Sequence, residues 1–531
     1  MRKLVTGRRM KEIDAYTIKD IGIPSMVLME RAALAAALEA EKEAEEGSVI
    51  WAVCGIGNNG ADGVAAARML HLKGYDARVV LAGDRTRGTE EFKSQLAIAE
   101  RLGVAVSVWQ EMEGRSCDIL VDALFGVGLS RMIEGEYRLC MEMLERLPKR
   151  PYTVAVDVPS GIHSDTGAVM GIALRADVTV TFGWEKLGTA LYPGREYAGR
   201  VIIDPVGFPP AALEDAPGQG NPSEGGEPLS AFSEDLSEDR PGNLPLGWAA
   251  AYEKKDLERI PGRRAYSNKG TFGRVLIAAG SKDMCGAAYL SALAAYRTGA
   301  GLVKILTVEE NRQALKTLLP EAILAVYRPE QILEGREAFR EMIEEQMNWA
   351  DVVVLGPGLG TEDYAEYLVE DILTSAFVPV ILDADGLNLV AAHPYLTAYY
   401  TENIVITPHL GEMARLTGLS VKEIQEDLPG AALSYASRYG ITCVLKDAAS
   451  VVAGKDGELY INTSGCSAMA KAGSGDVLTG IIAGLMAMGL EVEDAACLGV
   501  YVHGLAGEAA SVSGGHSLLA TELANAVEQV L

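Results

Sequence analysis

NTSGCSAMAKAGSGDVLTGIIAG, residues 462–484, joins a glycine-rich turn directly to an apolar run. Because glycine has no Cβ, the turn at residues 472–475 lets the backbone approach a ligand closely. The apolar run predicts a helix, whose free N–H groups and positive dipole end would face an anion held in the turn. Asp476 lies in the first turn of this helix. It is placed either to cap the helix or to accept a proton from a hydroxyl that attacks a phosphoryl group.

The second half of the chain repeats one arrangement, in which a buried strand pattern ends in glycines or polar residues. Alternating strands and helices predict a mostly parallel sheet with helices on both faces. The carboxyl ends of parallel strands lie at one edge of a sheet, where ligands bind. A lone histidine or lysine at such a position is more often structural or solvated, but the shared placement predicts one site. The residues expected to converge there are Gly356, His409, Lys446 and Asp476, and further strand-end residues are 357–360, Asp383, Asp385 and Glu412.

Three strands of the first half also end in polar residues. SVIWAVC is followed by GIGNNGADG at residues 55–63, and VAAARMLHLKGY then continues as a helix. Strand, glycine loop and helix are typical of a phosphate site, although this loop lacks the GxGxxG spacing and the lysine of a P-loop. Its amides and Asp62 offer groups for phosphate or a cation. By itself the loop is also consistent with an ordinary turn rich in Asn and Gly.

The other two strand ends have similar chemistry. Asp122 precedes the loop GVGLSR at residues 126–131, and Asp157 precedes PSG. Three such ends in one parallel sheet predict a ligand site in the first half as well. Ahead of these strands, Thr6 and Ser25 are predicted N-caps of two helices that open the chain.

The bulk composition is that of a globular protein with more than one domain. A chain of 531 residues is too long for one ordinary core, and its 58 glycines suit the tight turns of an α/β protein. The net charge of −26 argues against a general binder of nucleic acid or of anionic membranes. The seven cysteines form no CxxC pair. Reduced thiols, together with the lack of a membrane-spanning apolar run or a signal peptide, predict a cytoplasmic protein.

Residues 211–248 differ from the rest of the chain in being rich in Pro, Gly, Ser and acidic residues. Such a segment has little apolar surface to bury, so we predict a flexible acidic linker. It divides the chain into domains at residues 1–210 and 249–531.

Eight motifs in order make the chain similar to a known family. GNNGxDG, VDALFGxGLSR and DVPSG are followed by NKGxFGRVL, GSxxxxGAA, GPGLG, TPHxGEMARL and GSGDVLTG. Together they resemble the bifunctional NAD(P)H-hydrate repair enzymes, which join an NAD(P)HX epimerase to an ADP-dependent NAD(P)HX dehydratase. The resemblance covers nearly the whole chain outside the linker. It implies an α/β protein of two three-layer αβα domains, the first Rossmann-like and the second ribokinase-like.

For the epimerase domain, the resemblance implies a pocket that interconverts the R and S hydrates, with Asp157 as catalytic residue. A potassium ion would be bound by Asn59, Asp122 and Ser160. The residues that bind NADHX or NADPHX would be Asn58, Asn59, Gly60, Ala61, Asp62, Gly126, Val127, Gly128, Leu129, Ser130, Arg131, Met132 and Asp157.

For the dehydratase domain, the resemblance implies phosphorylation of the hydrate followed by elimination, with Asp476 as catalytic base and Mg²⁺ bound with ADP. Glu412 is the nearest match to a metal-organising acid. The hydrate would contact Ala287, Gly358, His409 and Asp476, and the nucleotide would contact Lys446, Asp447, Ala448, Ala449, Ser450 and Gly475. We expect a homo-oligomer that acts on NADHX, NADPHX and ADP and binds neither nucleic acid nor membrane.

The sequence departs from the family pattern at three places. Ala61 stands where the family usually has glycine, which would cost about 1 kcal/mol if the position needs a positive φ. Residues 279–281 read AGS in place of a GGS-type turn. Asp447 adds a carboxylate beside an anionic ligand, which would weaken nucleotide binding unless it points away or meets a cation.

Two other functions stay open from the sequence. The second half could be a kinase for a small hydroxylated metabolite, such as a sugar or a hydroxymethylpyrimidine, which would release a stable phosphorylated product. The first half could be a non-catalytic ligand-binding or interaction module. The presence of Asn59, Asp122, Asp157 and Ser160 argues against that second alternative.

Overall fold

The computed structural model describes residues 1–216, 247–511 and 515–531. It divides into two compact units, Lys3–Ala249 and Ala250–Leu531, the second including Met1–Arg2. Most of the predicted linker, residues 217–246, lies outside the described residues. Its first residues belong to the N-terminal unit, where the short helix α8 (Ala212–Asp215) is held by the buried Arg9 through the carbonyls of Leu213 and Ala216.

The N-terminal unit is built on a seven-stranded parallel sheet in the order β4-β3-β2-β5-β6-β7-β9. Outside this sheet, β1 (Arg2–Val5) pairs in parallel with β8 (Glu185–Lys186). The strands of the large sheet are β2 (Val49–Cys54), β3 (Asp76–Leu81), β4 (Ala105–Val108), β5 (Ile119–Ala123), β6 (Tyr152–Val156), β7 (Val178–Phe182) and β9 (Arg200–Asp204).

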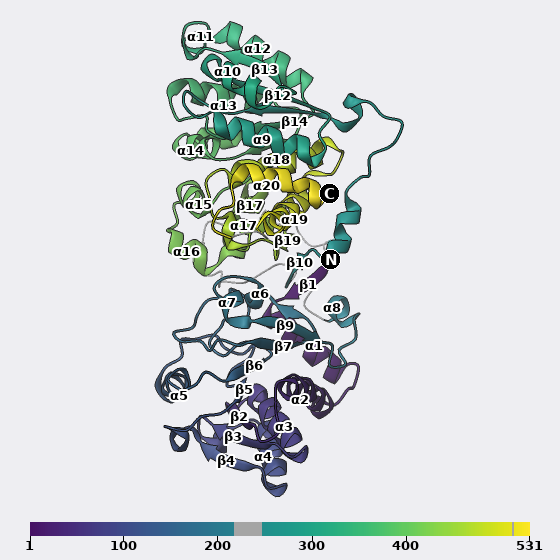
Figure 1. The fold of residues 1–531 in the computed structure, drawn as a ribbon, viewed down its shortest axis with the longest axis vertical. Helices are drawn as coiled ribbons and strands as arrows, with labels where there is room; N and C mark the ends of the chain where they lie inside the picture. The colour runs from purple at the N-terminus through teal and green to yellow at the C-terminus, as the bar shows by residue number, and fades with distance from the viewer. Residues whose placement is uncertain (217–246, 512–514) are drawn as a thin grey trace. The chain divides into compact units, whose positions relative to one another are not determined.

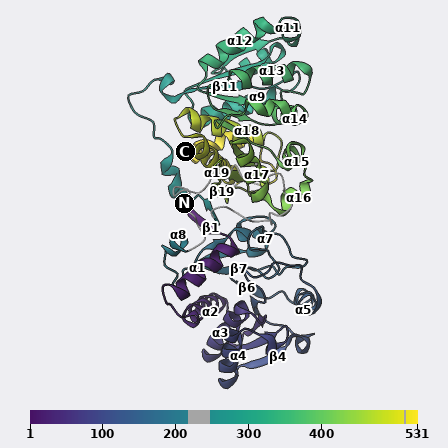
Figure 2. The same cartoon turned by 180° about the vertical axis from the view of Figure 1, so that it is seen from behind.

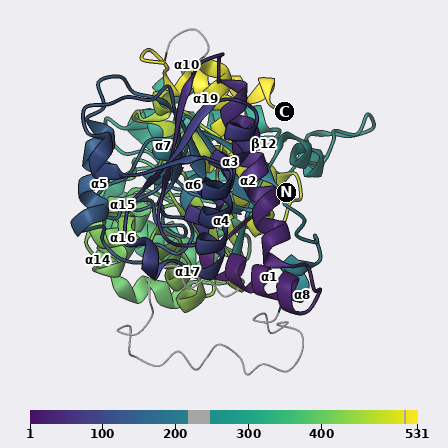
Figure 3. The same cartoon turned by 90° about the horizontal axis from the view of Figure 1, so that it is seen from below.

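Alternation along the strands places helices on both faces of this sheet. Ile50, Ala52 and Cys54 of β2 pack in the core shared with α2, α3 and α4, whereas Trp51 and Val53 pack in the core shared with α5. Figures 1 and 3 show α2 and α5 on opposite sides of the strands. The helices of this unit, besides α8, are α1 (Gly7–Lys19), α2 (Ser25–Lys42), α3 (Asn58–Leu72), α4 (Glu90–Arg101), α5 (Gly135–Glu145), α6 (Leu187–Ala190) and α7 (Gly194–Ala198).

The strands of the C-terminal unit follow the order β13-β12-β11-β14-β15-β16-β17-β18-β19-β10. Pairing is parallel from β13 to β17 and antiparallel through β18 and β19, so the prediction of a mostly parallel sheet is confirmed. The strands are β10 (Trp248–Ala251), β11 (Arg274–Ala278), β12 (Leu302–Val308), β13 (Ile323–Tyr327), β14 (Val352–Leu355), β15 (Val380–Leu382), β16 (Ile404–Ile406), β17 (Thr442–Leu445), β18 (Val451–Ala453) and β19 (Leu459–Ile461).

One face of this sheet is covered by α9 (Cys285–Thr298), α18 (Ser474–Ala487), α19 (Val492–Ala510) and α20 (Ala520–Ala526). Helices α9 and α18 lie side by side (Figure 2). Their approach is close because α18 carries glycines: a Cβ added at Gly480 would lie 2.2 Å from the carbonyl oxygen of Ser291. The remaining helices are α10 (Arg312–Leu318), α11 (Pro329–Glu334), α12 (Arg336–Trp349), α13 (Asp363–Ser375), α14 (Asp385–Ala392), α15 (Leu410–Thr417), α16 (Val421–Glu426) and α17 (Leu428–Tyr439).

The predicted α/β class is therefore confirmed for both halves of the chain. None of the helices found in the described segments is long and apolar enough to cross a bilayer.

Candidate active sites

The glycine turn at residues 472–475 forms the entry to α18, as predicted. Gly473 is the N-cap and adopts φ +90°, a conformation that favours glycine; an added Cβ there would also lie 2.6 Å from Leu290. Gly475 lies in the first helical turn, and an added Cβ would lie 3.3 Å from Lys446 Nζ and 3.9 Å from Asp383 Oδ2. The free N–H groups of α18 thus face the same place as a lysine and a carboxylate.

Lys446 follows β17 and is held by two acidic side chains. Its Nζ donates to Asp383 Oδ1 at 2.7 Å and lies 4.0 Å from Glu412 Oε2. Burial lowers the pKa of Lys446, but the neighbouring carboxylates of Asp383 and Glu412 outweigh burial and raise it above the ordinary value. The ammonium therefore stays charged and available to an anionic ligand.

His409 serves as the N-cap of α15, a role that the sequence did not predict. Its Nδ1 accepts from the N–H groups of Gly411 at 2.9 Å and Glu412 at 3.3 Å, and Glu412 Oε2 accepts from the N–H of His409 at 2.8 Å. Because Nδ1 is an acceptor, this network assigns the proton of the neutral ring to Nε2. A β-bridge places His409 beside Lys446, so these two predicted residues do come together.

Asp476 is surrounded by groups that change the pKa of its carboxyl. Burial raises its pKa to about 7, the charge of Asp383 adds to the rise, and Lys446 opposes it. Among the described residues, no group donates a hydrogen bond to its carboxylate; the hydrogen bond at Asp476 uses its backbone carbonyl, which accepts from Thr479. A free carboxyl that titrates near neutral pH can serve as a general base.

Two further predicted residues meet at the opposite side of this turn. Gly358 has φ +61°, and an added Cβ would lie 3.0 Å from the Cβ of Ala287 in the first turn of α9. Gly360 donates its N–H to Asp385 Oδ2 at 2.9 Å. The charge of Asp385 also raises the pKa of Asp476. Asp385 is therefore a neighbour both of the loop at 356–360 and of Asp476.

Asp383 and Asp385 were recognised in the sequence as strand-end residues but were not predicted as site residues. The residue between them, Ala384, adopts φ +50°, which is strained for a side chain other than glycine. Its strained backbone lies between two carboxylates, one paired with Lys446 and one with Gly360. The DADG motif at 383–386 was the available signal.

The predicted nucleotide segment at 446–450 forms the turn between β17 and β18. Ala449 is buried, so only its backbone can contact a ligand, whereas Asp447 and Ala448 are exposed. Ser450 Oγ donates to the carbonyl of Asp447 at 3.3 Å and closes the turn. The Asp447 residue is exposed as a whole, but partial burial of its carboxyl raises its pKa.

His503 of α19 is a residue near this site that the sequence reasoning missed. Its Nε2 lies 2.9 Å from the carbonyl oxygen of Ser474 and 3.2 Å from Ser474 Oγ. Burial lowers the pKa of His503 to about 4, so its ring is neutral at physiological pH. The sequence shows only one histidine in a mostly apolar helix, which does not reveal its partner Ser474.

In the N-terminal unit, the predicted loop at residues 55–63 is shorter than expected. Helix α3 begins at Asn58, with Gly57 as N-cap, so residues 58–63 are helical. Ala61 is buried and donates its N–H to the Gly57 carbonyl at 3.0 Å. Its φ is not positive, and the strain considered for alanine at this position is absent. Gly60 is the position that needs glycine, because an added Cβ would lie 1.9 Å from the carbonyl oxygen of Gly55.

The three predicted potassium ligands lie close together. Asp122, buried at the end of β5, accepts from the hydroxyl of Ser160 through Oδ1 and from its N–H through Oδ2 at 2.8 Å. A Cβ added at Gly126 would lie 3.0 Å from Asn59 Oδ1, and Asn59 Nδ2 is buried without a hydrogen-bond partner. Burial raises the pKa of Asp122 to about 6.

This donor set fits a monovalent cation. Carboxylate, hydroxyl and amide oxygens are hard ligands, and rotating the Asn59 amide would exchange its unpartnered NH₂ for an oxygen. Within the described ranges, no three His, Cys, Asp or Glu side chains are grouped so that they could hold a metal ion. One carboxylate with neutral oxygens suits K⁺ better than a divalent ion.

Asp157 follows β6 and adopts φ +70°. Its Oδ1 accepts from Thr181 Oγ1 at 3.1 Å, from the N–H of Phe182 at 3.3 Å and from Lys186 Nζ. Burial and the charge of Asp157 raise the pKa of Asp62 well above its ordinary value, which places Asp62 electrostatically near Asp157. Lys186 was not predicted from the sequence.

The predicted binding loop at 126–132 is only partly available to a ligand. Gly128, Ser130, Arg131 and Met132 are exposed, and Val127 packs partly against the small core of Val158 and Ile162. Leu129 is buried in the core beneath α5, so only its backbone is left to contact a ligand in the predicted pocket. The apolar side chain is more stable in that core than at a polar ligand.

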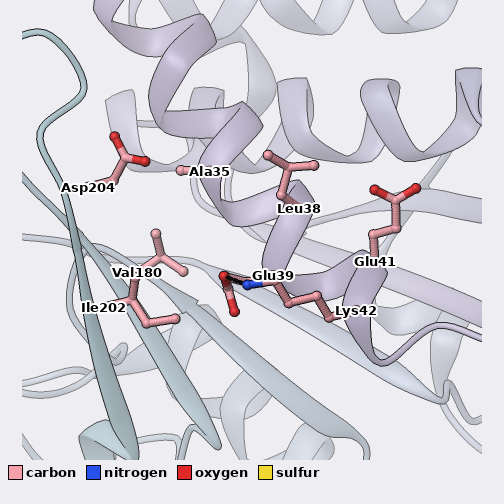
Figure 4. Close-up of a pocket in the computed structure, with 8 residues that line it drawn as sticks. All are labelled: Ala35, Leu38, Glu39, Glu41, Lys42, Val180, Ile202 and Asp204. Carbon is pink, nitrogen blue, oxygen red and sulfur yellow. Dashed lines mark hydrogen bonds and ion pairs between the residues drawn. The ribbon is translucent and has the colours of Figure 1, made fainter.

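A separate cavity of about 320 Å³ lies between α2 and the strands β7 and β9 (Figure 4). Its lining includes Glu39, which pairs with Lys42 and Arg200. None of the predicted site residues lines it; the lining residues are Ala35, Leu38, Glu39, Glu41, Lys42, Val180, Ile202 and Asp204.

Comparison with known proteins gives consistent matches. Residues 275–529 match the family described as NAD(P)H-hydrate dehydratase, and residues 25–188 match the family described as YjeF-related protein N-terminus. A bifunctional NAD(P)H-hydrate repair enzyme of Thermofilum pendens is 36% identical over 100% of this chain and 96% of its own length. Its counterpart in Escherichia coli is 33% identical over 91% of this chain and 85% of its own length.

A solved structure is also similar to the C-terminal unit. The ADP/ATP-dependent NAD(P)H-hydrate dehydratase from Bacillus subtilis, co-crystallised with ATP and Mg²⁺, is 32% identical, covers 53% of this chain and 97% of its own, and has a TM-score of 0.46.

Proposed function

Because this chain belongs to the family of bifunctional NAD(P)H-hydrate repair enzymes, we propose that its two units carry out successive steps in restoring hydrated NADH and NADPH. The N-terminal unit interconverts the R and S hydrates. The C-terminal unit dehydrates the S hydrate at the expense of ADP. We propose domain boundaries at residues 1–210 and 249–531, and assembly into a cytoplasmic homo-oligomer stays a prediction.

The observation that carries the second step is the free Asp476 carboxyl, with a pKa of about 7, at the N-terminus of α18. The hydroxyl of the hydrate is a poor leaving group until it is phosphorylated. Asp476 accepts the hydroxyl proton while the hydroxyl oxygen attacks the terminal phosphorus of ADP, and AMP leaves. Phosphate then departs with the C–O electron pair, and loss of a proton from the adjacent ring carbon restores NADH or NADPH.

The surrounding residues balance the negative charge of this transfer. Lys446 remains an ammonium beside Gly475, and the first N–H groups of α18 face the transferring phosphoryl group. Mg²⁺ commonly binds through nucleotide phosphates and one or two carboxylates, and Glu412 would be such a carboxylate here. When bound, the ion would supply further neutralisation of phosphoryl charge.

In the N-terminal unit, epimerisation requires the hydroxyl to leave one face of the ring and water to add to the other. Asp62, whose pKa burial raises well above its ordinary value, can donate a proton to the departing hydroxyl. Asp157, paired with Lys186, can accept a proton from the water that returns. Asn59, Asp122 and Ser160 would hold K⁺, whose charge offsets the buried Asp122 carboxylate.

The experiment that separates this function from a metabolite kinase measures products. Purified protein is given S-NADHX, ADP and Mg²⁺, and NADH, AMP and inorganic phosphate are quantified. We expect the three products in equal amounts. A stable phosphorylated product with little NADH would favour the kinase, and so would turnover of a sugar or a hydroxymethylpyrimidine in place of the hydrate.

A further inference from the structure

Lys186 is a fully buried lysine that the proposed mechanism uses only as a counterion. Its side chain is 0% exposed. Nζ donates to three oxygens: Asp157 Oδ1, Thr181 Oγ1 at 3.0 Å and the carbonyl of Phe182 at 2.9 Å. Burying an ammonium is costly unless its N–H groups are paired, and here all three have acceptors. The site is therefore built around this cation.

The geometry at Asp157 is equally specific. Oδ1 receives the ammonium, the hydroxyl of Thr181 and the N–H of Phe182, whereas none of the described residues donates to Oδ2. The Asp157 side chain keeps 11% of its surface exposed. Because Oδ1 is enclosed by donors, Oδ2 is the oxygen left to meet a ligand. The backbone supports this pose in a strained conformation with φ +70°.

We propose that Lys186 is a positioning residue of the epimerase, which fixes the Asp157 carboxylate so that Oδ2 alone faces the hydrated ring. This inference rests on the function proposed for the N-terminal unit. A lysine with only a structural role would stabilise the fold without affecting catalysis directly. Here, catalysis depends on the charge-assisted bond from Lys186 to one oxygen of Asp157, Oδ1.

The acidic neighbours explain why a cation is needed at this point. The charge of Asp157 raises the pKa of Asp14 in α1 and of Asp62 in α3, after burial as the larger cause, so both lie within electrostatic reach of Asp157. Lys186 donates to Asp157 and to neither of these two. It thereby distinguishes one carboxylate from the other two, whose pKa values are raised.

The test compares Lys186→Met, which keeps the length of the side chain without its charge, with Lys186→Arg, which keeps the charge. Full-length protein is supplied with R-NADHX, ADP and Mg²⁺, so that the dehydratase converts each S product to NADH. We expect Lys186→Met to lower the epimerisation kcat about 100-fold with KM changed less than about threefold, because the carboxylate is no longer held in place. Lys186→Arg should recover part of the rate.

The pH profile supplies the readout that a structural role would not move. Without the cation, Asp157 stands beside Asp14 and Asp62 with no opposite charge, so the acid limb of the Lys186→Met profile should shift toward higher pH. The matched control is Arg9→Met, which removes another buried cation of the same unit, one that holds α8. Its epimerisation profile should keep the native shape.

Epimerisation by Lys186→Met within about threefold of the native rate would overturn the proposal, as would a loss of rate with an unshifted profile. If Lys186→Met does not fold, Thr181→Val, which deletes one donor to Oδ1, carries the test: a kcat about fivefold lower at unchanged KM supports the proposal, and an unchanged kcat overturns it. Native protein that fails to epimerise R-NADHX while dehydrating S-NADHX would instead refute the function proposed for the N-terminal unit.

Discussion

Replacing Asp476 with asparagine should abolish dehydration and at the same time stabilise the protein at alkaline pH. The side chain lies at the N-terminus of α18, where burial, reinforced by Asp383, raises its pKa from 3.8 to about 7. A folded pKa above the unfolded value means that the folded state binds the proton more tightly. The native protein therefore loses stability as pH rises from about 4 through 7, while the carboxyl is forced to ionise.

The size of the effect follows from that shift. Three pH units correspond to about 4 kcal/mol, which is the upper limit of the penalty above pH 7. Part of it is already present at pH 5, so the advantage of Asp476→Asn should grow by about 2 kcal/mol between pH 5 and pH 8.5. Loss of the base should lower the dehydration kcat at least about 100-fold. Epimerisation, in the other unit, should not change.

The assay combines urea unfolding of the full-length protein at both pH values with NADH formation from S-NADHX. Asp363→Asn is the matched control, because Asp363 also lies in the first turn of a helix but is exposed. It should show no stabilisation that grows with pH. A stability difference between native and Asp476→Asn that is the same at both pH values would refute the argument from burial. Dehydration within tenfold of native would refute the role of Asp476 as base.

Three further predictions concern the two sites and a half-buried carboxyl of α19. Asp122→Ala should abolish consumption of R-NADHX and leave S-NADHX dehydration intact, as followed by chiral separation of the hydrates; unchanged epimerisation would contradict the cation site. His503→Phe removes the bond to the Ser474 carbonyl and should lower the dehydration kcat about tenfold, with partial recovery in His503→Asn. Burial raises the pKa of Glu493 to about 7, so the folded protein loses stability when this carboxyl ionises. In the same urea assay, Glu493→Gln should stabilise the protein by about 1 kcal/mol at pH 8.5, after allowance for solvent screening, and by less at pH 5.

The fold was predictable because its signals are local. Buried apolar runs that end in glycines or polar residues predicted the parallel strands, and the glycine turn before α18 has a backbone conformation that favours glycine. The N-cap at Thr6 is confirmed by its hydrogen bond from the N–H of Arg9 at 3.1 Å. The cap predicted at Ser25 is wrong: Pro24 is the N-cap, and Ser25 Oγ donates to Glu91 Oε1 at 3.5 Å.

The start of α3 was predicted too late because Asn and Gly favour turns in general. Here, Asn58 and Asn59 occupy the first turn of the helix, where small polar residues and free N–H groups are tolerated. The boundary matters for function because it moves these amides from a loop onto a rigid element. It also removes the concern about Ala61, which is helical and buried.

Lys186 and His503 could not be predicted because each acts through a partner that is distant in sequence. Lys186 bonds to Asp157, 29 residues away, and His503 to Ser474, also 29 residues away. Nothing in a short motif distinguishes a buried, fully paired lysine from a solvated one. Asp383 and Asp385, in contrast, were visible as strand ends, and only the strained turn at Ala384 and their bonds to Lys446 and Gly360 reveal their importance.

The most direct test of the whole account is recovery of near-UV NADH absorbance from a mixture of R- and S-NADHX, with K⁺, Mg²⁺ and either ADP or ATP. The account predicts full recovery with ADP, because the S hydrate is dehydrated while the R hydrate is converted to S. Recovery that stops at the S fraction would contradict the epimerase and support a non-catalytic N-terminal module. No recovery with either nucleotide would contradict the dehydratase and point to a metabolite kinase.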